Sequence, residues 1–493
     1  MERLPAEAGS SPSSSLLPSS PSKTTSRPPY DDEDPLADVA GAGGDGEKKA
    51  LGVFSMVAVV YFLVCGGSYG TEDLGGSLPP LFGLLGILVI PWLWSLPVAL
   101  ITAELATAMP DASGFLLWSR RAFGPFVSFL DAWIMIVVVI IDQALYPLIF
   151  VSYIETLVEL TWWQAYLINL GYILLCMIVN LLGVSTMGHF SKIFSALALL
   201  PFVIFVAAGF FSDRFDPHAW VETAKGKTIA SSTRPCPHEW DVPLYLSVLL
   251  WATCGFEYSG FLAGDVDKPR RTFPIVMIGS IFLMIATYFF PIAMAIAIAE
   301  DPSEITEGAY PALALEIGLG EWIKYLMIAG GLASTMGTYN AYLGTTASAL
   351  RAQAEEGVAP SIFSAFPQYK SPIVAIIFFS LTTAALVLLD FSVLVEIESL
   401  LYCLHVLLLA GTVIRLRWKE PELERPFALP FGKIGVVLIA SLPMLITFFN
   451  IGSLFYYGWI FPLISVGVVT SGCLLYLVRH LVRRRWEYHS YPS

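Results

Sequence analysis

The chain has 493 residues, of which 56% are hydrophobic and 14% are charged, and its formal net charge is −13. Soluble domains carry about 25% charged residues, and several apolar blocks here exceed the roughly 20 residues that cross a bilayer core. The composition therefore excludes a soluble globular protein, and the negative charge argues against a nucleic-acid binder. We predict an all-α polytopic membrane protein.

The N-terminal 48 residues have a different composition from the rest. They are rich in Ser, Pro, Gly and acids, as in SSPSSSLLPSSPSKTTSRPPYDDEDP. Such a segment cannot bury enough apolar surface to offset its ordering entropy, so residues 1–48 are predicted to be a disordered tail. Whether it is merely solvated or also regulated by phosphorylation stays open. A helical domain is expected over 49–480 and a short basic tail over 481–493.

Twelve membrane spans are predicted after the tail. They lie near 52–76, 80–108, 123–157, 163–183, 190–211, 242–263, 272–299, 321–350, 372–389, 393–415, 434–452 and 455–478.

Charges in the short loops predict the orientation of these spans. Basic residues follow every second span, whereas the alternate loops are acidic or neutral, as in IAEDPSEITEGAYPALALEIGLGE. Because cytoplasmic loops carry an excess of Lys and Arg, both termini are expected to be cytoplasmic. The supporting residues are Arg120, Arg121, Lys192, Lys268, Arg270, Arg271, Arg351, Lys370, Arg415, Arg417, Lys419, Arg425, Arg479, Arg483, Arg484 and Arg485.

Glycines interrupt two of the predicted spans. The first span contains GGSYGTED at 66–73, and the sixth contains CGFEYSGFLAGD at 254–265. Glycine-interrupted helices at equivalent places in two halves point to a binding site between inverted repeats. We therefore predict that helices 1 and 6 are discontinuous and that spans 1–5 and 6–10 form a 5+5 repeat with two extra helices. Close helix packing is the alternative use of such glycines.

Several acids fall inside predicted spans. Asp142 and Glu257 are deep, and neither has a Lys or Arg within its own span. A buried acid is costly without a partner, so a cationic substrate or a proton is expected there. Glu398, near the outer end of span 10, could instead face solvent with Glu396. Glu104 could simply pair with Arg120 or Arg121 near the cytoplasmic end of span 2.

The remaining sequence signals are negative. Five of the six cysteines lie in apolar spans and Cys236 lies alone in a polar loop, so no disulfide framework is expected. The spacing predicts no metal site, and motifs of ATP hydrolysis or membrane hydrolases are missing from the sequence. We expect neither an enzyme nor a cofactor.

Seven stretches carry a resemblance to a known family: GGSYGTED, WSLPVALITAEL, IDQALYP, LAGDVDKPRRTFP, EEGVAP, ESLLYC and RPFALPFG. In this order, over about 360 residues, they resemble the amino acid–polyamine–organocation superfamily. Within it the chain is most similar to polyamine uptake transporters of plants and protists, relatives of the L-type amino acid transporters. The resemblance implies the LeuT-type fold with twelve transmembrane helices, and a location in the cell membrane.

The resemblance also implies site residues. Asp142 occupies the acid position of span 3, Glu257 stands where the branch usually has an aspartate, and Tyr402 falls at an aromatic position of span 10. Two positions depart from the polyamine branch, because Val98 and Tyr342 stand where acids are usual. Their loss leaves room for a diamine or a basic amino acid. The implied substrate cradle of span 1 consists of Gly66, Gly67, Ser68, Tyr69 and Gly70.

Aromatic residues near the acids could also face ammonium groups. The further candidates for substrate binding are Gly255, Phe256, Tyr258 and Tyr339, with Glu72, Asp73 and Glu398 as secondary acids.

The leading hypothesis is a secondary transporter that imports polyamines with protons carried by Glu257 or Asp142. An amino acid transporter or exchanger of the same fold is the alternative, and a channel or signalling protein is a third. Sodium coupling would need a site at Ser334 and Thr335. The oligomeric state stays open.

Overall fold

The structure of the protein is a computed structural model that describes residues 57, 60–61, 64–110, 114–182, 187–221, 240–265, 269–355, 359–366, 369 and 371–489. At 187–196, 261–265, 269–270, 457 and 482–489 only the backbone is described. The predicted N-terminal tail, Cys236, Lys268 and Lys370 lie outside the described residues.

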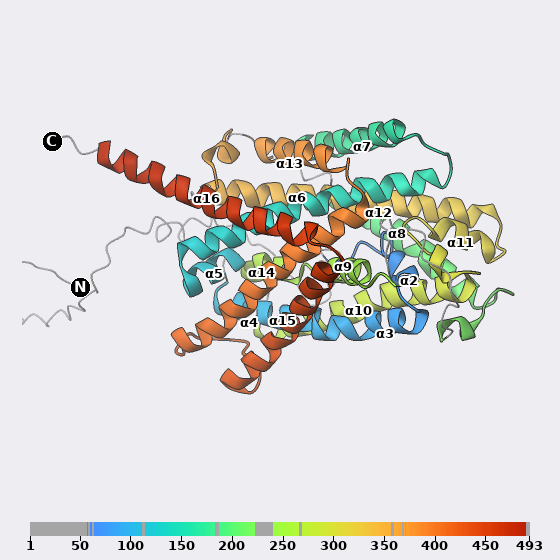
Figure 1. The fold of residues 1–493 in the computed structure, drawn as a ribbon, viewed down its shortest axis with the longest axis horizontal. Coiled ribbons are helices and arrows are strands. Elements are labelled where there is room, and N and C mark those ends of the chain that lie inside the picture. Colours follow the sequence, from blue (N-terminus) through green and yellow to red (C-terminus); the bar gives the residue numbers. More distant parts are fainter. Residues whose placement is uncertain are drawn as a thin grey trace, which may run out of the picture. The chain divides into compact units, whose positions relative to one another are not determined.

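The described residues form helices and no strands (Figure 1). In chain order the elements are α2 (Asp73–Gly76), α3 (Pro80–Leu93), α4 (Ser95–Ala108), α5 (Phe115–Phe123), α6 (Pro125–Glu155), α7 (Trp162–Leu182), α8 (Met187–Gly209), the 3₁₀ helix η3 (Pro217–Trp220), α9 (Val242–Ala252), η4 (Phe256–Asp265), α10 (Pro269–Ile298), η5 (Pro302–Glu304), α11 (Tyr310–Glu316), α12 (Glu321–Glu355), η6 (Ser361–Ser364), α13 (Ile373–Leu386), α14 (Phe391–Lys419), α15 (Gly432–Tyr457) and α16 (Ile460–His489).

Seven helices within the described residues are long and apolar enough to cross a membrane, which indicates a multi-pass membrane protein. Other predicted spans fall short for identifiable reasons. The first extends into residues that the structure does not describe, the sixth is interrupted, and the ninth corresponds to α13, which has only 14 residues. The eighth corresponds to α12, whose 35 residues include many Ser, Thr, Tyr and Gly. The C-terminal helix α16 continues to His489, so it takes in most of the predicted basic tail.

The predicted span over 80–108 is confirmed as one membrane-length segment, Pro80–Ala108, but it is kinked in the middle. The segment forms α3 and α4, which meet at Trp94, whose backbone is distorted to φ −109° and ψ −69°. Pro91 and Pro97 flank this residue, and proline has no N–H to donate to the preceding turn. The two prolines therefore explain why the helix breaks here.

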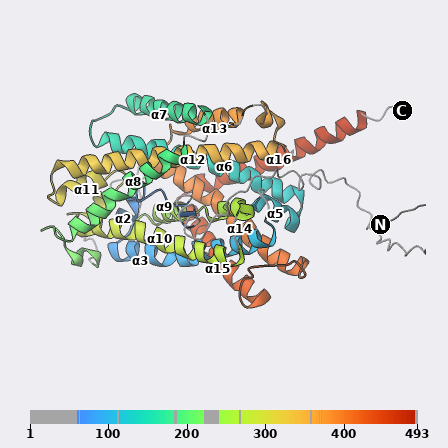
Figure 2. The ribbon, with the colours of Figure 1, turned by 180° about the vertical axis from the view of Figure 1, so that it is seen from behind.

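α14 is the most enclosed of the seven long helices. In its most apolar stretch 78% of the residues are buried, against 22% for α16. α14 packs against α6, α9, α15 and α5, and Figures 1 and 2 place it between the α6–α12 pair and α15. Elsewhere α7 lies beside α13, and α3 lies beside α10. Side chains of α14 are thus removed from lipid, and polar ones among them need partners inside the protein.

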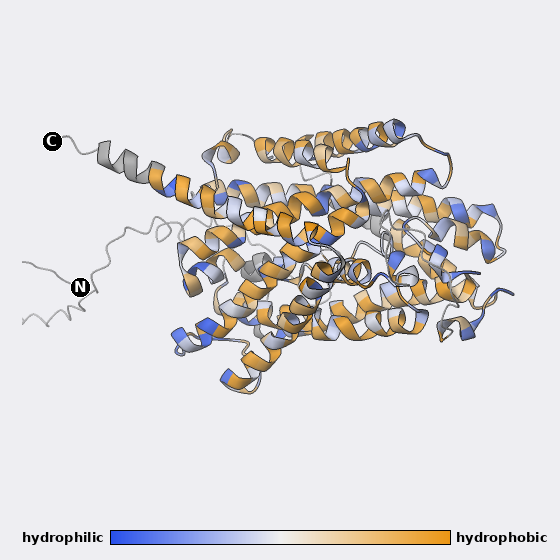
Figure 3. Cartoon of the chain, in the orientation of Figure 1, coloured by the Kyte–Doolittle hydropathy of each residue, from blue (hydrophilic) through white to orange (hydrophobic). Residues whose placement is uncertain are grey.

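Hydrophobic residues cover the length of most helices, and hydrophilic residues gather at helix ends and in the connecting loops (Figure 3). Large apolar side chains are widely exposed on α15 and α16, for example Leu438, Leu445, Phe449, Leu463 and Leu474. A monomeric soluble protein rarely exposes so much apolar surface, so these faces are suited to contact lipid.

Candidate functional site

The first predicted interruption is present between Val64 and α2. The last helical bond runs from Cys65 N to Tyr61 O at 2.7 Å, and Gly67 and Gly70 follow with φ of +104° and +79°. Side chains with a Cβ rarely adopt such angles, so glycine is required. The Gly66 carbonyl accepts a bond from Ser334 Oγ of α12 at 2.5 Å. The interrupted segment is therefore anchored on α12.

The second interruption lies between α9 and η4. Gly255 has φ +95°, and its N–H donates to the Tyr402 hydroxyl of α14 at 3.1 Å. The carbonyls freed by the break accept bonds from side chains: Thr253 O from Ser95 Oγ and Ala252 O from Tyr288 Oη, each at 2.8 Å. Broken helices persist at membrane depth only where their backbone groups find such partners or a polar cavity.

A cavity of about 60 Å³ lies between the two interruptions. It is bounded by the broken segments and by α6, α9, α10 and α12. No Lys or Arg contributes to its described wall, and Asp142 is the one acid there. The lining residues are Val64, Cys65, Gly66, Gly67, Tyr69, Thr71, Asp142, Tyr146, Ile149, Trp251, Ala252, Cys254, Gly255, Tyr258, Tyr288, Ser334, Thr335, Thr338 and Tyr342.

Asp142 is held in place by the indole group of Trp251 and by the side chains of Tyr342 and Tyr146. Its Oδ1 accepts a bond from Trp251 Nε1 at 2.6 Å, and its side chain is 6% exposed. Tyr146, Tyr258 and Tyr342 also line the cavity, and the hydroxyls of the last two are 3.2 Å apart. A negatively charged oxygen surrounded by aromatic rings suits an ammonium group, which gains from both.

Glu257 lies beside the cavity but does not line it. Its Oε2 accepts a bond from the Tyr402 hydroxyl at 2.6 Å, whereas Oε1 has no hydrogen-bond partner, and the side chain is fully buried. Through Tyr402, the carboxylate is linked to the Gly255 N–H. Glu257 and the backbone of the second interruption thus share one hydrogen-bonding partner, Tyr402.

Glu398 and Glu396 are buried, with exposures of 1% and 2%. The alternative of a solvated mouth at the outer end of span 10 is therefore wrong. One carboxylate oxygen of Glu398 has no hydrogen-bond partner, and the charges of Asp142 and Glu257 act on it.

Other candidates from the sequence lie away from the cavity. The Ser68 hydroxyl is 2.8 Å from that of Tyr310, and Tyr339 packs edge-on against Tyr172 at 5.3 Å, on the side of α7. Gly70 and Phe256 do not contribute to the cavity wall either, whereas Gly66, Gly67, Tyr69 and Gly255 do.

The secondary acids form an outer cluster. The Tyr153 hydroxyl donates to Glu72 Oε1, and Glu72 is fully buried. Asp73 begins α2 and is 8% exposed. Glu307 lies in the loop before α11, where burial, helped by the charges of Asp73 and Glu72, raises the pKa of Glu307 to about 8. The cluster thus contains a carboxyl group, on a half-buried side chain, whose pKa is raised above the ordinary value of a glutamate.

The structure also contains a buried pair of polar side chains that the sequence does not predict. Asp131 of α6 and His405 of α14 form a buried hydrogen-bonded pair with Oδ1 and Nδ1 2.7 Å apart. An acid within the apolar run FLDAWIMIV is the same kind of signal that pointed to Asp142. The partner of His405 comes from another helix, and no local pattern in the sequence indicates it.

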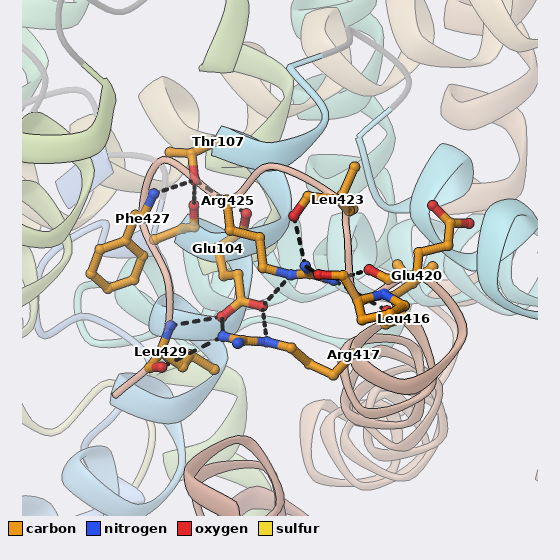
Figure 4. A network of polar contacts seen from close by, with 11 residues as sticks. Glu104, Thr107, Leu416, Arg417, Glu420, Leu423, Arg425, Phe427 and Leu429 are labelled. Carbon is orange, nitrogen blue, oxygen red and sulfur yellow. Dashed lines mark hydrogen bonds and ion pairs between the residues drawn. The ribbon is translucent and has the colours of Figure 1, made fainter. Parts of the chain in front are cut away.

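Glu104 is paired, but not with the residues expected from the sequence. Its carboxylate contacts Arg417 at 2.8 and 2.5 Å, Arg425 at 3.3 Å and the Leu429 N–H at 2.7 Å (Figure 4). The prediction that Arg120 or Arg121 is the partner is wrong. Arg121 instead pairs with Glu420 at 2.7 Å. The Glu104 network, meaning Glu104 with these two arginines and Leu429, ties α4 to α14 and its following loop.

A multi-pass helical protein with two interrupted helices around a small polar cavity has the construction of a membrane transporter. The amino acid permease family matches residues 51–476, and the chain belongs to this family, within the amino acid–polyamine–organocation superfamily. The family and the names of the relatives indicate a transporter and not an enzyme.

Curated relatives agree with this assignment. A probable polyamine transporter of Arabidopsis thaliana is 29% identical over 90% of this chain and 87% of its own. The polyamine transporter RMV1 of the same plant is 30% identical over 80% of this chain and 79% of its own. The large neutral amino acids transporter small subunit 2 of Mus musculus is more distant, at 25% identity over 82% and 77%.

Proposed function

We propose that the chain is a secondary active transporter that imports polyamines of the putrescine and spermidine class by alternating access. The observation that carries the proposal is the composition of the cavity wall. Asp142 stands there among aromatic rings, and the described residues of the wall include no basic side chain. The names of the similar plant proteins support the same substrate class.

An amino acid is the second candidate substrate. The backbone of Gly66 and Gly67 lines the cavity and could receive a carboxylate, as helix ends do for anionic groups. Tyr342 stands where acids are usual in the polyamine branch, which leaves the wall with a single charge and favours a short diamine over a long polycation. A basic amino acid would satisfy both the backbone amides and Asp142.

We further propose that spans 1–5 and 6–10 form a LeuT-type inverted repeat of twelve spans in all, with α15 and α16 as the additional helices. Support comes from the two interruptions, which fall five spans apart. The basic loops support cytoplasmic termini, with 1–48 as a cytoplasmic tail, and the cell membrane is the location expected from the family.

Protons are the proposed coupling ion. A buried carboxyl can exchange a proton when a cationic substrate approaches, and both Glu257 and Asp142 are buried near the cavity. Sodium would need oxygens of Ser334 and Thr335 as ligands. Ser334 Oγ is in direct hydrogen-bond contact with Gly66 O at 2.5 Å, so an ion held between these two oxygens would have to separate them.

Uptake in proteoliposomes tests the substrate class. Radiolabelled putrescine, spermidine, arginine and leucine are compared side by side, with and without an inward proton gradient. We expect putrescine and spermidine to be transported best and leucine least. Robust leucine uptake that excess putrescine does not inhibit would overturn the proposal.

A further inference from the structure

The buried pair of His405 and Asp131 has no part in the cavity described above. It joins α14 to α6, and the exposures of the two side chains are 0% and 1%. Removing two ionisable groups from water is costly, and apolar residues would hold two helices together as well or better. A purely structural role therefore gives no reason for choosing an ionisable pair.

One nitrogen of His405 is available as a proton acceptor. A carboxylate can only accept a hydrogen bond, so the Nδ1 that lies 2.7 Å from Asp131 Oδ1 carries the proton. Nε2 is buried and has no hydrogen-bond partner. In a neutral imidazole this atom has a free lone pair, and the Asp131 carboxylate would stabilise the imidazolium formed when it takes a proton.

The neighbouring carboxyl group of Glu257 also has an oxygen without a hydrogen-bond partner. Glu257 Oε1 is also buried without a partner. Tyr402 contacts both groups: its hydroxyl is 2.6 Å from Glu257 Oε2, and its ring centroid is 5.9 Å from that of His405. One tyrosine thus neighbours both residues that carry a buried atom without a hydrogen-bond partner.

The charged groups around His405 come from two elements. α6 presents Asp131 and η4 presents Glu257, and these are the charges that act on the imidazole. α5 contributes only the edge of Phe115, whose ring centroid is 4.8 Å away. On α4, Glu104 is held by its own arginines. The described surroundings thus offer His405 two acids and no base.

We propose that the Asp131–His405 pair accepts the coupling proton from Glu257 and passes it toward the predicted cytoplasmic side. The proton leaves the Glu257 carboxyl group, directly or through a bridging water, and binds Nε2 of His405. The imidazolium keeps its Nδ1–H donated to the Asp131 carboxylate. Loss of the proton to the cytoplasm restores the neutral imidazole, while Glu257 is left ionised.

The positions along the helices give this path a direction. Asp131 lies six residues after the first residue of α6, near the N-terminal end of this helix. That end follows directly on α5, which carries the basic residues Arg120 and Arg121 in its last turn. Asp142, which lines the cavity, lies three turns further along α6. The pair is therefore displaced from the cavity toward the basic end of the bundle, as a proton exit requires.

The inference rests on the proposed proton symport, so the test measures both. Three assays are made on proteoliposomes: putrescine exchange at equal pH, uptake driven by an inward gradient of about two pH units, and acidification of the lumen on adding putrescine. Exchange needs substrate binding and movement of the carrier, but it does not need the proton to be released.

His405→Asn is the decisive variant, because an asparagine amide can still donate to Asp131 but cannot take up a proton. The Asp131→Asn, His405→Asn double variant removes both ionisable groups together and so leaves no buried carboxylate without its histidine. Asn180→Ala is the matched control, since it removes a buried bond of 3.0 Å to Asn340 between α7 and α12, far along the chain from the pair.

We expect both variants to exchange putrescine within about threefold of wild type, while stimulation by the proton gradient falls about tenfold and acidification disappears. The control should retain all three activities. Variants that keep the gradient response, or that lose exchange and gradient response together, would overturn the inference while proton symport stands. If wild-type protein transports putrescine without any response to the gradient, the proposed symport itself is wrong.

Discussion

Neutralising Asp142 should separate substrate affinity from protein stability. Asp142→Asn keeps the shape and an oxygen that can accept the 2.6 Å bond from Trp251, but it removes the charge that faces the cavity. If that charge binds a substrate ammonium, binding must weaken. Because burying a charge is costly, the substrate-free variant should be as stable as wild type or more so.

The size of the effect follows from the single contact involved. A hydrogen bond to a charged group contributes about 1.5–3 kcal/mol net, which corresponds to roughly a 10- to 150-fold rise in KM for putrescine. Aromatic neighbours are unchanged, so the contribution from ring faces is retained. Asp142→Glu, which keeps the charge on a longer side chain, should raise KM less than about tenfold.

Concentration-dependent putrescine uptake in proteoliposomes gives KM, and thermal unfolding of the purified variants gives stability. A wild-type KM in Asp142→Asn would show that the carboxylate does not meet the substrate. A large loss of stability together with lost uptake would instead mean that Asp142 serves the fold.

Three further predictions concern other parts of the chain. Gly67→Ala should reduce uptake at normal surface expression, because Gly67 has a φ of +104° that a residue with a Cβ rarely adopts. Gly452→Ala is the control and should leave uptake unchanged, because open space surrounds Gly452. Equal uptake by the two variants would contradict this prediction. Glu104→Gln should lower the free energy of unfolding by about 3–5 kcal/mol, because it leaves mostly buried arginines without their partner. Glu420→Gln, in the half-exposed pair with Arg121, should lower it by less than about 1 kcal/mol. Similar denaturation midpoints for the two variants would refute this prediction. The raised pKa of Glu307 means that its protonated form stabilises the folded state at a pH below the ordinary pKa of a glutamate, and this contribution is lost as pH rises through about 8. Wild type should therefore lose thermal stability relative to Glu307→Gln between pH 5 and 8. Melting temperatures of the two proteins that change in parallel with pH would contradict this prediction.

Long-range pairing was beyond the reach of the sequence. The partners of Glu104 come more than 300 positions later, and Asp131 and His405 are 274 positions apart. Which buried groups meet depends on how helices pack, and no local pattern records that. The nearest basic residues in the sequence, Arg120 and Arg121, were therefore the wrong choice for Glu104.

The positions that line the cavity were also decided by packing. Asp142 and Glu257 give the same sequence signal, an acid without a base in its own span. In the structure Asp142 contributes to the cavity wall, whereas Glu257 is turned to Tyr402. A one-dimensional pattern cannot tell these two environments apart, because the direction of each side chain depends on the neighbouring helix.

The sequence by itself determined the class of the molecule and the places where its helices break. Long apolar blocks require membrane-spanning helices, because backbone groups in lipid must bond within their own segment, and glycines at 66–70 and 255 permit the positive φ angles that end such helices. Only the tertiary structure decided which polar atoms complete those breaks. Ser334, Ser95, Tyr288 and Tyr402 come from other helices, and their bonds exist only once those helices have packed.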